Sequence, residues 1–494
     1  MISYALRANY TFDERYMLTA TVRWDGSSKF EPDQRWGCFP SVAVAWRASQ
    51  EKFLQNVKWL SNLKVRLSYG VTGNNTGVGN YATRTTVAGP VYYPFGSTYV
   101  NAFYPSSIVD RFLTWEESKE INFGIDFGFL KNRIFGSVDL YQKTSDDLLY
   151  SVELPLEAGT DSDGNPMKLN TNVGSVQNRG IEFAVTAIPV ITKDWRWDIS
   201  LNYARNINKV KEINGSGANL PNDNLFIGCS INNVYGYHWA GIVTDRDMIV
   251  PNTEIAVAKG LTPGSTMKEY DYYNICYGLQ EGNPIIEDVN GDGTIDDKDK
   301  KVYRSDPSWT GSLTTSLSYK NWDLSASLYT KQNYKVYSDF YAQYLDYKDR
   351  GWMHLNVDYY IPAGTLIDCD GINPDGTYIN PVYQQTTHYG AYPFPNDGNT
   401  AGLNGTHAFN RDGSQCQAIT DASFVKVKNI TLGYTFPKKW INKIGISHLR
   451  LYCTVTNPFV WTDYKGFDPE WAGGGAENDG PSTVTWEFGA SLKF

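Results

Sequence analysis

The chain has 494 residues, a formal net charge of −9 and an aromatic content of 15%. It shows no block of Lys and Arg residues, which argues against nucleic acid as a partner because phosphate binding needs clustered cations. It also shows no run of about 18 apolar residues, which excludes membrane-spanning helices. The mean hydropathy of −0.42 is compatible with a membrane β-barrel, whose strands are apolar only at alternate residues.

Apolar side chains recur at every second position from one end of the chain to the other, which predicts β-strands. In chain order the expected strands lie at 3–12, 16–24, 39–47, 63–72, 121–129, 134–144, 179–188, 195–204, 309–319, 322–331, 430–436, 447–456 and 484–494. We expect roughly 14 strands in all, most of them about 9 to 13 residues long. We expect no helix longer than about two turns.

The connections between these strands alternate between tight and long. Tight turns fall at 13–15, 131–133 and 320–321, whereas long insertions are expected at about 73–115, 244–308 and 332–420. Short periplasmic turns and long extracellular loops are typical of outer-membrane barrels. The sequence therefore predicts an all-β fold, an antiparallel transmembrane β-barrel with long extracellular loops. A soluble β-sandwich also alternates, so it remains the alternative architecture.

Side-chain type differs between the two faces of the expected strands. Aromatic residues lie near strand ends on the apolar face, as interfacial girdles require: Tyr4, Trp24, Trp46, Trp195, Tyr319 and Trp322. Charged residues lie on the opposite face, which would line the barrel: Lys64, Arg66, Asp126, Glu182, Arg196, Asp198, Asp323, Arg450 and Glu487. A charge on the lipid face would cost about 2–4 kcal/mol at mid-bilayer, so this separation is expected for a barrel.

Several longer motifs keep a fixed order along the chain. They are RWDGSSKF at 23–30, LKVRLSYGVTGN at 63–74, TWEESKEINFGIDFGFL at 114–130, NVGSVQNRGIEF at 172–183, SFVKVKNITLGYTFP at 423–437 and RLYCTVTNPFVWTDYKGFDPE at 450–470. Over nearly the whole chain they resemble the SusC/RagA family of TonB-linked outer-membrane proteins. The last residue, Phe494, fits this resemblance, because barrels of this kind end in an aromatic residue.

The resemblance implies a function that composition could not supply. SusC-like proteins import glycans or peptides across the bacterial outer membrane, driven by the TonB–ExbB–ExbD complex. A SusD-like surface lipoprotein covers the barrel and shares substrate binding. Transporters of this class have a barrel of about 22 strands with a plugged lumen.

The chain departs from this pattern in its strand number and at its beginning. Residues 1–12 already alternate like a strand, with no signal peptide before them, and no plug domain or TonB box is recognisable. We therefore expect residues 1–494 to be the C-terminal portion of an incomplete barrel. Its coupling to TonB–ExbB–ExbD would run through the N-terminal part of the parent protein.

The segment 288–299, DVNGDGTIDDKD, matches a calcium-binding loop. Calcium prefers six or more hard oxygen ligands, and Gly293 would provide the sharp turn. The candidate ligands are Asp288, Asn290, Asp292, Thr294 through its carbonyl, Asp296 directly or through water, and Asp299. No helix clearly follows, so bound Ca²⁺ would be structural. A metal-free acidic turn is the alternative interpretation.

Residues for enzymatic chemistry are not grouped in this sequence. The five His residues are far apart, and no G-x-S-x-G or H-E-x-x-H motif occurs, so we expect no enzymatic activity. The 332–420 insertion contains aromatic residues, including Trp352, Tyr359, Tyr360 and Tyr389, to which the sequence assigns no binding role. The leading hypothesis is part of a nutrient importer; the alternative is a surface-exposed β-sandwich binding or adhesion protein.

Overall fold

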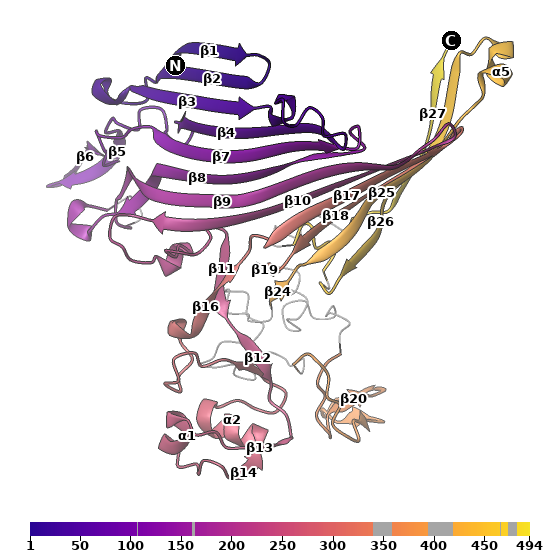
Figure 1. Cartoon of the computed structure of the whole chain (residues 1–494). Helices are drawn as coiled ribbons and strands as arrows, with labels where there is room; N and C mark the ends of the chain where they lie inside the picture. The colour runs from indigo at the N-terminus through magenta and orange to yellow at the C-terminus, as the bar shows by residue number, and fades with distance from the viewer. Residues whose placement is uncertain (106, 161–163, 339–357, 394–417, 465, 473–481) are drawn as a thin grey trace.

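The computed structural model describes residues 1–105, 107–160, 164–338, 358–393, 418–464, 466–472 and 482–494. Its main feature is one curved antiparallel sheet of 13 strands, seen from β1 to β27 in Figure 1. The strands are β1 (Ile2–Phe12), β2 (Tyr16–Gly26), β3 (Trp36–Trp46), β4 (Leu60–Asn74), β7 (Glu116–Phe129), β8 (Ile134–Glu153), β9 (Lys168–Ile191), β10 (Trp195–Glu212), β17 (Trp309–Tyr319), β18 (Trp322–Gln332), β25 (Phe424–Thr435), β26 (His448–Thr462) and β27 (Thr485–Lys493).

Each strand of this sheet pairs with its neighbours in chain order, and β1 and β27 form the two edges. The expectation of an all-β fold built from antiparallel strands is thereby confirmed. The other sheets of the described residues are two-stranded, and none matches the main sheet in size. The β-sandwich alternative, which needs two large stacked sheets, is therefore wrong.

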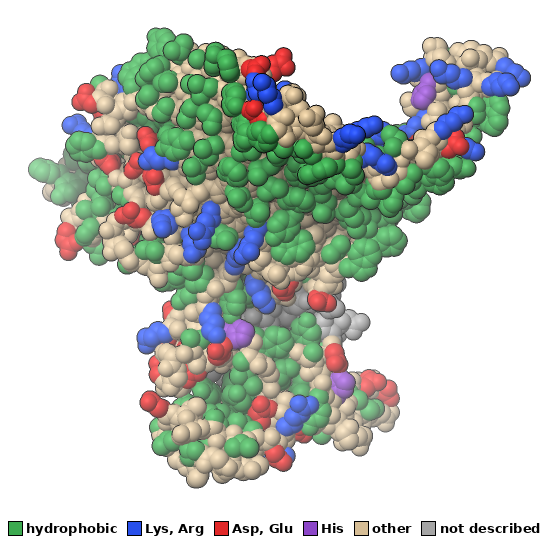
Figure 2. Space-filling model, viewed as in Figure 1, with side chains coloured by type: hydrophobic (Ala, Val, Ile, Leu, Met, Phe, Trp, Pro, Cys, Tyr) green, Lys and Arg blue, Asp and Glu red, His purple; other side chains and the backbone are tan. Residues whose placement is uncertain are grey.

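Strand register produces a continuous apolar face. Leu6 lies opposite Val22, and Tyr10 lies opposite Leu18, so apolar side chains of neighbouring strands share one side. The pattern continues to the last strand, where Cys453 lies opposite Phe488. These side chains remain open: Leu6 is 69% and Phe488 77% exposed. Figure 2 shows hydrophobic side chains spread over the sheet. Apolar exposure on this scale is typical of a surface covered by lipid.

Aromatic rings gather at the ends of the strands on this face. At the tight-turn end the Trp195 and Tyr319 ring centroids lie 4.1 Å apart, and those of Trp322 and Tyr434 lie 4.7 Å apart. Nearer the opposite end Tyr4 pairs with Trp24. These positions fit the two interfacial girdles expected from the sequence.

Several strands are longer than the sequence indicated. β8, β9 and β10 have 20, 24 and 18 residues, whereas we expected about 9 to 13 for most strands. Their extra residues, such as 168–177 in β9, lie at the end that carries the long connections. There the strands lack the regular polar and apolar alternation that the membrane imposes.

The long connections contain small folded units. The connection between β4 and β7 carries the hairpin β5 (Val87–Phe95) and β6 (Thr98–Pro105). The one between β10 and β17 carries β11 (Asn233–Tyr237), β12 (Trp239–Ile242), β13 (Asp247–Ile249), α1 (Glu254–Ala258), β14 (Thr266–Lys268), α2 (Glu269–Tyr277), β15 (Pro284–Ile286) and β16 (Lys300–Arg304). The one between β18 and β25 carries β19 (Lys335–Tyr337), β20 (Leu366–Asp368), β21 (Gly371–Ile372), β22 (Tyr378–Ile379), β23 (Val382–Tyr383) and β24 (Ile419–Asp421). Figure 1 shows the last two regions projecting together below the sheet.

The nine-residue helix α2 corrects the expectation that no helix exceeds two turns. It forms because Tyr272 and Cys276 are buried against Val250, Ile255 and Ala256, a contact with residues outside the helix. Trp352 and much of the 332–420 insertion lie outside the described residues. No helix among the described residues is long and apolar enough to cross a membrane.

Candidate functional site on the inner face

The face of the sheet opposite the apolar one carries paired charges. Arg66 of β4 binds Asp126 of β7, with Nη2 2.8 Å from Oδ1, and also reaches Asp139 of β8 at 3.1 Å. Lys64 lies 4.0 Å from the same Asp126 carboxylate. Because Arg66 contacts two carboxylates, it offsets the repulsion that they would otherwise exert on each other.

A second ion pair connects β18 to β26. Arg450 binds Asp323 through two hydrogen bonds, of 3.0 Å from Nε and 2.5 Å from Nη2. The pair crosses the intervening strand β25 at Gly433, where an added Cβ would lie 2.5 Å from Arg450 Nη2. On β10, Arg196 and Asp198 pair at 2.8 Å. The charges expected inside the barrel are thus mostly neutralised in pairs on one face.

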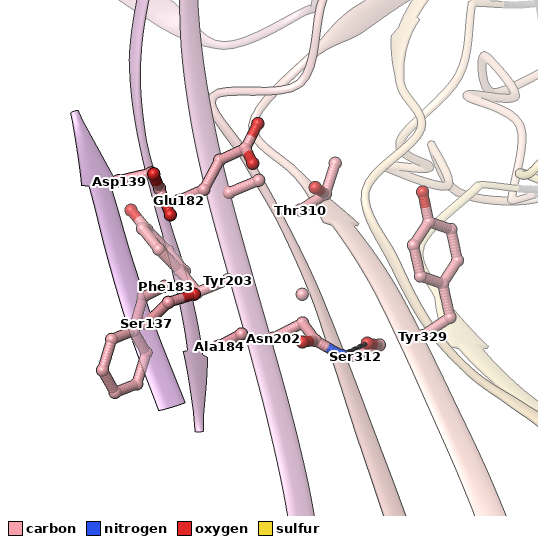
Figure 3. A pocket seen from close by; sticks show the side chains of 12 residues that line it. Ser137, Asp139, Glu182, Phe183, Ala184, Asn202, Tyr203, Thr310, Ser312 and Tyr329 are labelled. Carbon is pink, nitrogen blue, oxygen red and sulfur yellow. Dashed lines mark hydrogen bonds between the residues drawn. The ribbon is translucent and has the colours of Figure 1, made fainter. Parts of the chain in front are cut away.

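Between these ion pairs the wall has a shallow cavity of about 200 Å³. Figure 3 shows side chains of β8, β9, β10, β17 and β18 around it. Asn202 donates a hydrogen bond of 3.1 Å to Ser312 Oγ. Asp139 lies opposite Glu182 on the neighbouring strand. No described residue forms an ion pair or hydrogen bond with Glu182, so its carboxylate can still accept hydrogen bonds.

The side chains of this cavity can form hydrogen bonds with the polar groups of a ligand. The cavity presents hydroxyl groups, an amide, two carboxylates and the ring of Tyr329, and no nucleophile with an adjacent base lines it. A surface of this kind can form hydrogen bonds with a polar ligand passing along the wall. Of its lining residues, the sequence predicts Glu182, Asn202 and Ala204 on the inner face. The sequence does not single out the cavity itself, because short polar residues at alternating positions carry no distinctive motif.

The acidic segment 288–299 is held by hydrogen bonds from its own backbone. Asp288 accepts from Gly291 N at 2.7 Å and from Gly293 N at 2.8 Å. Asp299, which is fully buried, accepts from Val289 N and from Asp296 N, both at 2.8 Å. The first and last of the predicted ligand positions are therefore brought close together.

The remaining predicted ligands lie on the outside of the same turn. Asn290 Nδ2 donates to Asp292 Oδ2 at 2.9 Å, and Thr294 N donates to Asp292 Oδ1 at 2.8 Å. The backbone N–H of Lys298 donates to Asp296 and holds the pKa of that carboxyl below its usual value. Within the described ranges, no group of three or more His, Cys, Asp or Glu side chains is arranged to hold a metal ion. Calcium binding at this loop stays a prediction.

Comparison with known proteins identifies the relatives of this chain. Residues 3–458 match the family described as TonB dependent receptor-like, beta-barrel. The chain is 34% identical to the TonB-dependent receptor SusC of Bacteroides thetaiotaomicron, over 100% of its own length and 44% of that receptor. It is 30% identical to the TonB-dependent receptor P39 of Formosa agariphila, over 94% of the chain and 43% of the relative.

Solved structures show the same fold. The structure of the RagAB peptide transporter superposes with a TM-score of 0.69 at 23% identity, covering 100% of this chain and 47% of that one. The chain thus spans less than half the length of the relatives that it matches. The resemblance to SusC/RagA proteins that its motifs indicated is confirmed. The chain belongs to the TonB-dependent receptor family of outer-membrane β-barrels and is of the SusC/RagA type.

Proposed function

We propose that this chain forms part of a TonB-dependent outer-membrane importer of glycans or peptides that works with a SusD-like surface lipoprotein. The observation that carries the proposal is the division of one 13-strand sheet into an apolar outer face and a polar, ion-paired inner face. That division fits a wall with lipid on one side and a passing hydrophilic substrate on the other. The SusC relative and the likeness to the RagAB peptide transporter support import over other outer-membrane functions.

The folded connections suggest where substrate and lipoprotein would bind. Tight turns lie at one end of the sheet, and the long connections of 213–308 and 333–423 lie at the other. In outer-membrane barrels the long loops face the cell exterior. We assign substrate capture and the lipoprotein contact to this end. Energy coupling to TonB–ExbB–ExbD is proposed for the whole protein. The SusC relative is more than twice as long as this chain.

Gene deletion in the source bacterium tests the proposal. The deletion strain should lose growth on at least one oligosaccharide or peptide as sole nutrient, and the intact gene should restore it. A strain lacking TonB should show the same defect. Affinity purification of the tagged protein from outer membranes should recover a SusD-like lipoprotein. Equal growth of wild-type and deletion strains on glycans and peptides would refute import.

We also propose that the segment 288–299 binds Ca²⁺ as a structural ion. The residues that would hold it are Asp288, Asn290, Asp292, Thr294, Asp296 and Asp299. The closure of this loop by Asp288 and Asp299 supports the proposal, because it brings the two ends of the ligand set together. Binding would require the carboxylates of Asp292 and Asp296 to turn inward, since each now accepts hydrogen bonds from its own neighbours.

A further inference from the structure

A second cavity, of about 520 Å³, lies among the long connections and away from the sheet. Its volume falls in the range of small-molecule sites. Two segments far apart in the sequence form it, namely 239–246 at β12 and the region 360–391. Aromatic side chains line much of it: Trp239, Tyr360 and Tyr389.

Hydrogen bonds between the two segments fix this cavity. Asp245 accepts hydrogen bonds from the hydroxyl groups of Tyr389 and of Thr387, the latter at 2.9 Å. Tyr360, which is 1% exposed, accepts from Asp245 N at 3.2 Å and donates to Glu281 at 2.7 Å. The carboxylates of Asp245 and Glu281 are thus engaged by hydroxyl groups of the opposite segment.

Arg246 is the one charged residue among those lining the cavity. Its guanidinium lies 4.4 Å from the centroid of the Tyr389 ring, a cation–π contact that orients the guanidinium plane. No described carboxylate forms an ion pair with it. The nearby Asp247 is paired instead with Lys268, at 2.9 Å. A positioned guanidinium without an acidic partner keeps N–H donors free for a ligand.

We infer that this cavity binds a carboxylate-bearing ligand, with Arg246 holding the carboxylate and the rings of Trp239 and Tyr389 contacting the body of the ligand. Arginine is well suited to this role because its planar fork matches a carboxylate through two hydrogen bonds. Two sources share this chemistry: a uronic acid unit of an anionic glycan, and an acidic peptide. The inference names the ligand class for the import function proposed above and rests on it.

Calorimetry with the detergent-purified chain tests the inference. The probes are trigalacturonate, the neutral trisaccharide maltotriose, a tri-glutamate peptide, and the corresponding glutamine peptide with an amidated C-terminus. At least one anionic probe should bind roughly 10-fold or more tightly than its neutral counterpart, because charged hydrogen bonds add affinity. The anionic probe that binds identifies the source.

Arg246→Gln should weaken that anionic probe by roughly 10- to 100-fold and leave the neutral probe unchanged. Lys259→Gln, at the exposed residue that follows α1, removes the same charge outside the cavity lining and should keep the preference. A thermal unfolding midpoint equal to that of the wild type shows that Arg246→Gln is folded. Equal binding of charged and neutral probes, unchanged binding by Arg246→Gln, or no binding up to about 10 mM would overturn the inference. Growth phenotypes test import separately, so either idea can fail without the other.

Discussion

Arg66 of β4 reaches Asp139 of β8 across the intervening strand, at the position where β7 carries Gly124. An added Cβ at Gly124 would lie 2.6 Å from Asp139 Oδ1 and 2.7 Å from Arg66 Nη2. Glycine at this position therefore allows an ion pair to span three strands of the inner face. Arg450 and Asp323 repeat the arrangement over Gly433 of β25.

Gly124→Ala should displace this ion pair and lower the free energy of unfolding by about 1–3 kcal/mol, the cost of losing part-buried charged hydrogen bonds. Gly79→Ala is the matched control, because no atom lies within 4 Å of the Cβ that it adds. Urea unfolding of both variants in detergent gives the comparison. Equal midpoints for the two variants would show that the close approach at Gly124 does not contribute to stability.

A positive charge should be tolerated on one face of β4 and not on the other. Leu67 points outward and is 45% exposed, whereas the next residue, Ser68, faces the inner side. Leu67→Arg should cost about 2–4 kcal/mol near mid-bilayer and reduce the amount of protein in the outer membrane. Ser68→Arg should accumulate like the wild type. Immunoblots of fractionated membranes measure both, and equal depletion would argue against a lipid-facing outer surface.

The sheet could be predicted from the sequence because the bilayer requires apolar and polar side chains to alternate along each strand. In 195–204, for example, Leu201 faces outward and Asn202 inward, and the register places Leu201 opposite Leu313 and Asn202 opposite Ser312. Outside the membrane this alternation is no longer required. Residues 168–177 of β9 and the helix α2 have mixed polarity, so their structure depends on contacts with distant residues.

The loop cavity could not be predicted for the same reason. Tyr360 and Tyr389 were visible in the sequence as aromatic residues without a role. Their partner Asp245 lies 115 and 144 residues away, and no local pattern indicates that pairing. The acidic segment 288–299 is the opposite case, because its candidate ligands lie within twelve residues and the motif can be recognised from the sequence alone.

The contact between Asp245 and Tyr389 should depend on pH. The hydrogen bond from the Tyr389 hydroxyl holds the pKa of the Asp245 carboxyl below its ordinary value of 3.8. The stabilisation is therefore present above pH 3.8 and is lost as the pH falls through the lower folded-state pKa. In Tyr389→Phe, protection of the 239–246 segment should be lost at higher pH than in the wild type. Hydrogen exchange followed by mass spectrometry measures this, and identical pH profiles would contradict it.

Calcium should protect the 288–299 segment from proteolysis. Without a cation the carboxylates at 288, 292, 296 and 299 repel one another, and a divalent ion would remove that repulsion. Asp292→Asn should therefore abolish the protection that Ca²⁺ gives and a chelator reverses. Asp271→Asn, a similar change in α2 outside the loop, should leave it intact. Cleavage at the same rate with Ca²⁺ and with chelator would show that the loop is a metal-free acidic turn.

The most direct measurement is the accessibility of nitroxide labels along β10 in isolated outer membranes, in a background without native cysteines. Labels at 199, 201 and 203 should collide with oxygen dissolved in lipid, whereas labels at 198, 200 and 202 should collide with a water-soluble nickel reagent. This alternation is the expected result for a wall with lipid on one side and a hydrophilic lumen on the other. Equal accessibility of the two sets to the nickel reagent would place both faces in water and contradict the membrane assignment.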